Sequence, residues 1–284
     1  MESKEASNPR PETDPAPSEV TPSRVRAMQV RAPISPRADL LIGLAGILFF
    51  AGIWCWLTYG GVVKPLFLPS PTAIWEGLGE FNKQGWLLRA IEGSVVRVVK
   101  SLLLVMAIGI PVGILMGAFT PVDAFLRKIV NGSKSVPTTG IVGLIVLWFG
   151  IEERAKIVFL VLGAVFYMII LVRSAILSVN EDYLRVSLDI GAKPFETVRK
   201  VLIPAALPQI WDAIAVCSGI MWTYIVLAEY INGNEEQIGL GYLLNIGSKT
   251  QDSGKVFGIL ILVALISSLT DFGLGWVRKR FLNW

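Results

Sequence analysis

Among the ionisable side chains in or beside apolar stretches of the sequence, three are candidates for contact with a solute, because a charge there is costly and usually faces a cavity or a partner. Arg97 and Lys100 are three positions apart, so a helix would place both on one face, where they could attract a small anion. Glu229 ends a second apolar stretch that also contains Trp222 and Tyr224. We predict that Arg97, Lys100, Trp222 and Glu229 contact a solute. The competing interpretation is that both bases extend to a membrane interface and that Glu229 makes a structural hydrogen bond or ion pair.

Residues suited to covalent or metal chemistry are scarce. The sequence has no histidine, which is the commonest general base and metal ligand. Cys55 and Cys217 stand far apart in apolar stretches, as small buried residues do. Gly254-Lys255 is followed by Val256, so it is not part of a phosphate-binding loop. We therefore expect no catalytic site, no metal site and no cofactor in this chain.

The composition is typical of a protein embedded in a lipid bilayer. Of 284 residues, 53% are hydrophobic and 17% are charged, against about 25% charged in soluble domains. Six apolar stretches have lengths near the 20 or so residues that cross a bilayer, at about 40–60, 96–119, 136–150, 155–178, 205–228 and 256–277. Pro137 and Gly140 interrupt the third, which could have a half-helix before it. The net charge of +4 comes from bases between these stretches, so we expect no nucleic-acid partner.

Residues 1–37 differ from the rest of the chain. They are rich in proline and charge and poor in large apolar groups, so we predict a disordered tail, followed by a membrane domain over residues 38–284. With the N-terminus inside, basic residues are about twice as frequent on the inside as on the outside. The sequence therefore predicts that both termini are cytoplasmic.

The segment of about 180–204, between the fourth and fifth stretches, carries a distinct pattern. Leu184 and Leu188 would share one face of a short helix. Gly191 is suited to a left-handed helix stop, and Pro194 to the first turn of the next helix. That second helix would carry on one side Phe195, Val198 and Leu202, and Pro204 would interrupt it. The segment is either an ordinary loop or a docking element for another protein.

This segment resembles the cytoplasmic loop of binding-protein-dependent ABC importer permeases. Gly191 is followed, after nine residues, by Val201-Leu202-Ile203-Pro204, at the spacing of that family's glycine and its Ile-x-Leu-Pro. Arg185-Val186-Ser187 stands where the family has Glu-Ala-Ala. Three further patches resemble the nitrate, taurine, alkanesulfonate and bicarbonate branch: Leu68-Pro69-Ser70-Pro71, Leu147-Trp148-Phe149-Gly150, and Ala228-Glu229 with Gly239-Leu240-Gly241-Tyr242.

The resemblance implies an all-α type I ABC importer permease fold in the bacterial inner membrane, with about six transmembrane helices and a cytoplasmic coupling helix. It implies that the ATPase-coupling residues are Leu184, Arg185, Leu188, Gly191 and Ala192. The implied partners are a second permease copy in a homodimer, ABC ATPase subunits that bind ATP and Mg, and an extracytoplasmic substrate-binding protein. The implied cargo is a small anion such as nitrate, bicarbonate, taurine or an alkanesulfonate.

Two other classes of protein compete with this interpretation. A secondary transporter or channel that is not driven by ATP would also be polytopic, but such proteins often show internal repeats, which we do not detect. An intramembrane enzyme would need a nucleophile and base, or a metal set, within the spans. Dependence of uptake on ATP separates the importer from the secondary transporter.

Overall fold

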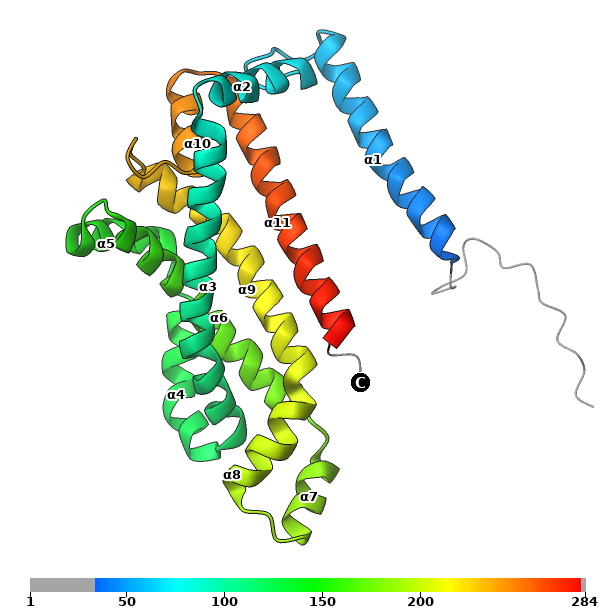
Figure 1. Cartoon of the computed structure of the whole chain (residues 1–284), viewed down its shortest axis with the longest axis vertical. Helices are drawn as coiled ribbons and strands as arrows, with labels where there is room; N and C mark the ends of the chain where they lie inside the picture. The colour runs from blue at the N-terminus through cyan, green and yellow to red at the C-terminus, as the bar shows by residue number, and fades with distance from the viewer. Residues whose placement is uncertain (1–33, 282–284) are drawn as a thin grey trace, which may run out of the picture. The chain divides into compact units, whose positions relative to one another are not determined.

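A computed structural model describes residues 34–281, apart from the side chain of Asn232, and every regular element in this range is helical. The α-helices are α1 (Pro36–Tyr59), α2 (Pro71–Lys83), α3 (Trp86–Ala118), α4 (Thr120–Ser133), α5 (Val142–Phe149), α6 (Glu153–Leu177), α7 (Glu181–Asp189), α8 (Pro194–Thr197), α9 (Ile203–Asn232), α10 (Leu240–Lys249) and α11 (Ser253–Phe281). A 3₁₀ turn, η1 (Thr138–Ile141), precedes α5, and a π-helical turn, η2 (Val198–Leu202), joins α8 to α9. Figure 1 shows their order.

The chain divides into two units at Ile53, and each is described by itself. In the first unit, α1 begins at Pro36. The predicted disorder of residues 1–37 therefore concerns mainly residues 1–33, which lie outside the described part. The second unit, from Trp54 onward, holds all the other helices.

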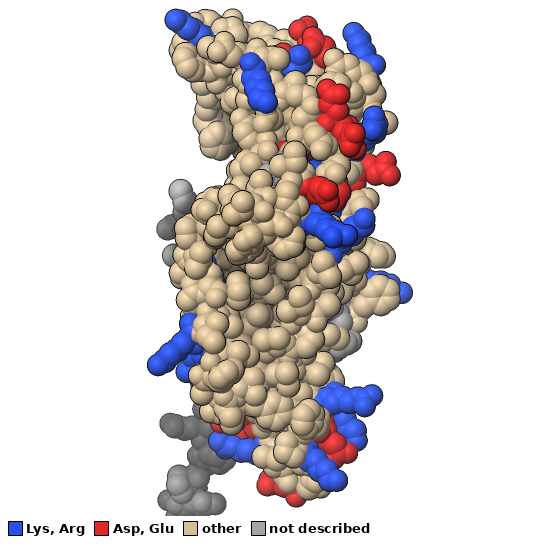
Figure 2. Space-filling view, turned by 90° about the vertical axis from the view of Figure 1, so that its left-hand side faces the viewer, with Lys and Arg blue, Asp and Glu red and all other residues tan. Residues whose placement is uncertain are grey.

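Five described helical segments are long and apolar enough to cross a membrane: Pro36–Tyr59, Trp86–Ala118, Glu153–Leu177, Pro194–Ile231 and Ser253–Phe281. On the face shown in Figure 2, charged side chains lie mainly over the upper half and at the lower end, and the band between them is mostly uncharged. This distribution suits a bilayer, because apolar surface contacts the lipid tails and charges contact the headgroups. Five of the six predicted spans therefore correspond to long helices.

The third predicted span, 136–150, is not one spanning helix. Its residues form η1 and α5, and the apolar helical run Thr138–Phe149 is too short to cross a bilayer alone. Pro137 precedes η1 in an extended conformation, with ψ of 109°, and so separates this run from α4.

The chain between α3 and α6 nevertheless has to cross from one end of the bundle to the other. α3 and α6 run parallel, because Gly109, Gly113 and Gly117 face Met168, Val172 and Ile176 in the same order. Near its start, α4 bonds to the last turns of α6 through Asp123 and Arg173. At the opposite end, α5 packs on the first turns of α6. The third crossing is thus a broken one, formed by α4, η1 and α5.

A stripe of glycines allows α3 and α6 to approach closely. A Cβ atom added at Gly109, Gly113 or Gly117 would lie within 2.6–2.7 Å of a side-chain carbon of α6. Small residues every fourth position are typical of tightly packed membrane helices, because helix association in lipid depends on close packing.

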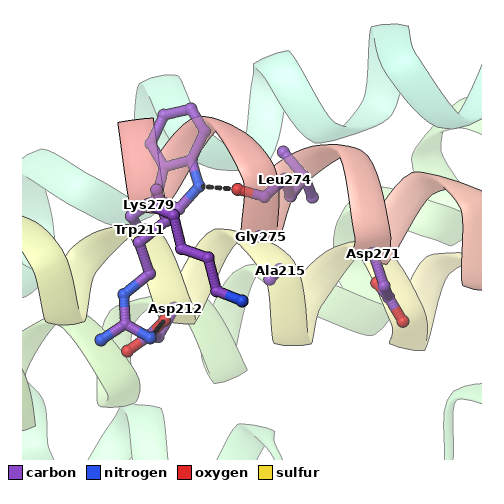
Figure 3. A pocket seen from close by; sticks show the side chains of 8 residues that line it. Trp211, Asp212, Ala215, Asp271, Leu274, Gly275 and Lys279 are labelled. Atoms are coloured by element: carbon purple, nitrogen blue, oxygen red, sulfur yellow. Dashed lines mark hydrogen bonds and ion pairs between the residues drawn. The ribbon is translucent and has the colours of Figure 1, made fainter. Parts of the chain in front are cut away.

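The α9 helix runs antiparallel to both α6 and α11. Gln209, at the start of α9, bonds to Ser178 after the end of α6, whereas Ala228 packs with Phe159 near the start of α6. Figure 3 shows the start of α9 facing the last turns of α11, where the Trp211 indole donates a hydrogen bond of 2.8 Å to the Leu274 carbonyl.

These contacts define two ends of the second unit, which Figure 1 shows at opposite extremes of the bundle. The α7 end holds α7, α8 and the last turns of α3, α6 and α11. The α10 end holds α2, α10 and the first turns of α3, α6 and α11.

Candidate functional site

The segment between α6 and α9 folds as the glycine and proline predicted. Gly191 has φ of 80°, a left-handed conformation. Its N–H donates to the Leu188 carbonyl at 2.9 Å, and the Ala192 N–H donates to the Ser187 carbonyl at 3.0 Å. This pair of bonds forms a Schellman stop, which satisfies carbonyls left free at the end of α7. Pro194 then occupies the first turn of α8, where its missing N–H costs nothing.

Caps and one buried contact fix the shape of this segment. The Asn180 side chain caps α7 by accepting from the Asp182 N–H at 2.9 Å. The buried hydroxyls of Ser187 and Thr197 lie 3.2 Å apart and join α7 to α8. The α7–α8 segment is therefore a folded knob.

The outer surface of the α7–α8 segment is apolar as well as charged. The exposed apolar side chains are Tyr183, Val186, Leu188, Ile190 and Phe195. Leu184 is half-buried and packs against the main core, so Leu188 alone of the predicted leucine pair is exposed. Arg185 is exposed and paired with Glu181 at 3.3 Å. An exposed face with this mixture is suited to contact with another protein.

Of the predictions about the second helix of this segment, the one concerning Pro204 is wrong. Val198 and Leu202 are buried, but Phe195 is 72% exposed, because residues 194 and 195 lie in the first turn, outside the bundle. Pro204 does not interrupt the helix. The Ile203 N–H donates to the Val198 carbonyl, five residues back, and this π-turn precedes the proline, which stands in the first turn of α9.

The α7–α8 segment also touches the start of the broken crossing. The rings of Phe119 and Phe195 lie 5.5 Å apart. Next to Phe119, the buried Asp123 accepts from Arg173 at 2.5 and 2.8 Å and pairs with Arg127. α4 is thereby fastened to α6 beside the α7–α8 segment.

At the α10 end, Arg97 is buried and lies at the centre of an ion network. Its Nε donates to Glu153 at 2.8 Å, and Nη1 donates to Glu229 at 2.7 Å and to the Ile238 carbonyl at 3.2 Å. Nη2 donates to Glu153 and, at 3.1 Å, to the Gln237 carbonyl. All five N–H donors of this guanidinium are therefore occupied.

Glu229 has no exposed surface and caps the neighbouring helix. It accepts from Ser94 at 2.8 and 2.9 Å and from the Gly241 N–H at 3.0 Å. Ser94 in turn accepts from the Leu240 N–H at 3.0 Å. The first N–H groups of α10 thus meet a carboxylate and a hydroxyl, which suits the positive end of a helix.

Lys156 completes the charge balance of this network. It is fully buried, donates to the Gln237 side chain at 3.0 Å and lies 3.9 Å from Glu153. Arg97 and Lys156 carry two positive charges, and Glu153 and Glu229 carry two negative ones. The four charges cancel, so the network as a whole offers no net charge to an anion.

The structure brings together only two of the four residues predicted to contact a solute. Arg97 and Glu229 form an ion pair, whereas Lys100 is exposed on α3 and Trp222 is buried two turns before Glu229 on α9. Contact of all four with a solute stays a prediction. Sequence reasoning missed Ser94, Glu153, Lys156 and Gln237. Ser94 and Arg97, three apart on α3, were the available signal for a shared helix face.

Comparison with known proteins agrees with this architecture. The chain is 28% identical to the taurine transport system permease protein TauC of Escherichia coli over 264 residues, covering 91% of this chain and 94% of that protein. It is 30% identical over 232 residues to the putative aliphatic sulfonates transport permease protein SsuC of Bacillus subtilis, covering 82% and 83% of the two chains.

A solved structure of the MetNI methionine ABC transporter, in an inward-facing conformation, shares the fold. It superposes with a TM-score of 0.62 over 69% of this chain and 95% of that one, at 23% identity. The family model described as "binding-protein-dependent transport system inner membrane component" matches residues 109–283, which include α4 to α11. This chain belongs to that family and is a permease component of an ABC importer.

Proposed function

We propose that this permease carries a small sulfonate, such as taurine or an alkanesulfonate, and that the α7–α8 segment couples its movement to ATP hydrolysis. The single observation that supports the coupling role most is the rigid, exposed knob formed by α7, the Gly191 stop and α8. The similarity to two sulfonate permeases supports the cargo class. Nitrate and bicarbonate are the competing cargoes.

In this proposal, ABC ATPase subunits bind ATP and Mg and also contact the α7–α8 segment. The contact would involve Leu188 and Arg185 on the exposed face, with Gly191 and Ala192 holding the shape. Leu184 packs against the core, so it would transmit a force from the α7–α8 segment into the bundle. Closure of the ATPase pair would then rock the bundle between inward-facing and outward-facing states.

The proposal also covers orientation and assembly. The α7 end and both chain termini would face the cytoplasm, and the α10 end would face an extracytoplasmic substrate-binding protein. A second copy of this chain would complete the pathway, because so few crossings enclose little space of their own.

Uptake by cells that lack the gene tests the cargo. Labelled taurine, an alkanesulfonate, nitrate and bicarbonate are each supplied with and without ATP depletion. We expect one ATP-dependent uptake of taurine or the sulfonate to be lost and then restored by the gene. Loss of nitrate or bicarbonate uptake instead would overturn the sulfonate assignment. Uptake that survives ATP depletion would show that transport is not driven by ATP.

Variants of the α7–α8 segment test the coupling. Gly191→Pro cannot adopt φ of 80° and loses the N–H that bonds Leu188, so we expect transport to be abolished while the chain still inserts. Gly191→Asn is the matched control, because asparagine tolerates the left-handed region. Leu188→Asp should uncouple transport by placing a charge in the contact. Normal uptake by both Gly191→Pro and Leu188→Asp would contradict the docking role.

A further inference from the structure

The Arg97 network joins two groups of helices at the α10 end. Ser94 and Arg97 belong to α3, and Glu153 and Lys156 belong to α6, and these two helices are packed tightly through the glycine stripe. The other partners are Glu229 on α9, the carbonyls of Gln237 and Ile238, and the first N–H groups of α10. Every polar bond of Arg97 therefore crosses from α3 to another segment.

The same network leaves no guanidinium donor and no net positive charge with which to bind an anion. The guanidinium has five donors and five acceptors, and the four charges cancel. An anion could reach Arg97 only by displacing Glu153, Glu229 or a carbonyl. This saturation argues against the direct solute contact that the sequence predicted for Arg97 and Glu229.

Between the Arg97 network and the Ser178–Gln209 bond, the interface of α6 and α9 is held mainly by apolar packing. The Tyr224 ring covers Gly163 and lies edge-on to Phe159, with ring centroids 5.9 Å apart. The Cys217 thiol lies 3.9 Å from the Ala164 carbonyl. Such a contact surface can shift without leaving charges unpaired, whereas the Arg97 network is satisfied in one arrangement only.

We propose that Arg97 is a positioning residue that acts as a latch. It holds residues 237–241 against α3 and α6 in the arrangement described here, and it releases them when the α10 end opens. The inference rests on the proposed function, since an importer has to open this end during its cycle. Glu229, capping α10, makes that helix move together with α9.

Distances between two spin labels can follow the latch directly. Glu92 and Glu236 are exposed and line a cavity of about 290 Å³ beside Arg97, and neither makes a bond to the network. Each is replaced by a labelled cysteine, with Cys55 and Cys217 replaced by alanine, in the complete transporter in lipid nanodiscs. The distance is measured without nucleotide and after trapping with ATP and vanadate.

We expect a single short distance without nucleotide and a longer one after trapping. Arg97→Met should show both distances without nucleotide, because the latch no longer holds. Arg97→Lys should restore part of the population that has the short distance. Lys83→Met is the matched control: it removes an exposed charge at the end of α2, at the same end of the bundle, and should leave the distances unchanged. If Arg97→Met does not insert, Glu153→Gln serves instead, since that carboxylate is 41% exposed.

Kinetics of taurine uptake separate a latch from a solute ligand. A latch variant should change the maximal rate and leave KM unaltered, whereas loss of a ligand should raise KM. A wild-type distance distribution in Arg97→Met, or a distance that trapping leaves unchanged in the wild type, overturns the latch. Absence of any ATPase activity in the assembled complex would instead refute the proposed function.

Discussion

Replacing Gly113 by alanine tests the packing of α3 on α6. The added methyl carbon would lie 2.7 Å from Cβ of Val172 and 2.9 Å from the Ile169 carbonyl oxygen. Carbon atoms in contact prefer about 3.5–4.0 Å, so the two helices would have to separate locally by about 1 Å. Neither neighbour is the free end of a flexible side chain. The strain therefore cannot be relieved by a simple rotation.

Gly219→Ala is the control, because alanine at this position is expected to stabilise the protein, whereas alanine at Gly113 is expected to destabilise it. Gly219 also lies within a long helix, but no atom would lie within 4 Å of an added Cβ. Alanine is favoured over glycine within a helix by about 0.5–1 kcal/mol at both sites. Overpacking costs about 1–3 kcal/mol at Gly113 only. Because the helix preference cancels in the comparison, Gly113→Ala should be less stable than Gly219→Ala by about 1–3 kcal/mol.

Unfolding in detergent measures this difference. Both variants and the wild type are purified in the same mild detergent and titrated with sodium dodecyl sulfate, and loss of helix is followed by circular dichroism. We expect Gly113→Ala to unfold at a lower dodecyl sulfate fraction than Gly219→Ala. Equal midpoints, or a higher midpoint for Gly113→Ala, would refute the close approach of α3 and α6.

The remaining predictions concern the α7 end. Gly191→Ala should cost about 1 kcal/mol, since φ of 80° strains any residue with a Cβ, and thermal unfolding of the variant measures this. Asp123→Asn should cost about 3 kcal/mol near neutral pH, because it leaves Arg173 without its carboxylate partner. The melting temperatures of wild type and Asp123→Asn measure this loss, and equal values would contradict the ion pair. Trp211→Phe should lose about 1 kcal/mol with the bond to Leu274, and unchanged unfolding would show that this bond contributes nothing.

Local sequence signals predicted the local structure well. The long apolar runs became long helices because, in lipid, a run of some twenty apolar residues has few alternatives to a helix. Gly191 and Pro194 behave as expected, because their backbone preferences act whatever the surroundings. The broken third crossing was signalled only by Pro137 and Gly140, and its path along α6 required the tertiary contacts.

Long-range pairing could not be predicted from spacing. Arg97 and Glu229 are 132 positions apart, and their ion pair depends on how α3 and α9 meet. Periodicity shows which residues share a face, but not which helix that face contacts. Arg97 and Lys100 were grouped for this reason, although one is buried and the other exposed. The same limit explains why half-burial of Leu184 was missed.

The arrangement of contacts suggests which parts of the bundle move as bodies. α3 and α6 are joined by the glycine stripe, and α4 is fastened to α6 through Asp123. α9, α10 and α11 form a second group, through the Glu229 cap on α10 and the Trp211 bond to α11. The α7–α8 segment is the covalent link between these groups, because it follows α6 and precedes α9. A force applied to it therefore acts on the α6–α9 interface, and the Arg97 network is the polar contact that resists this force at the far end.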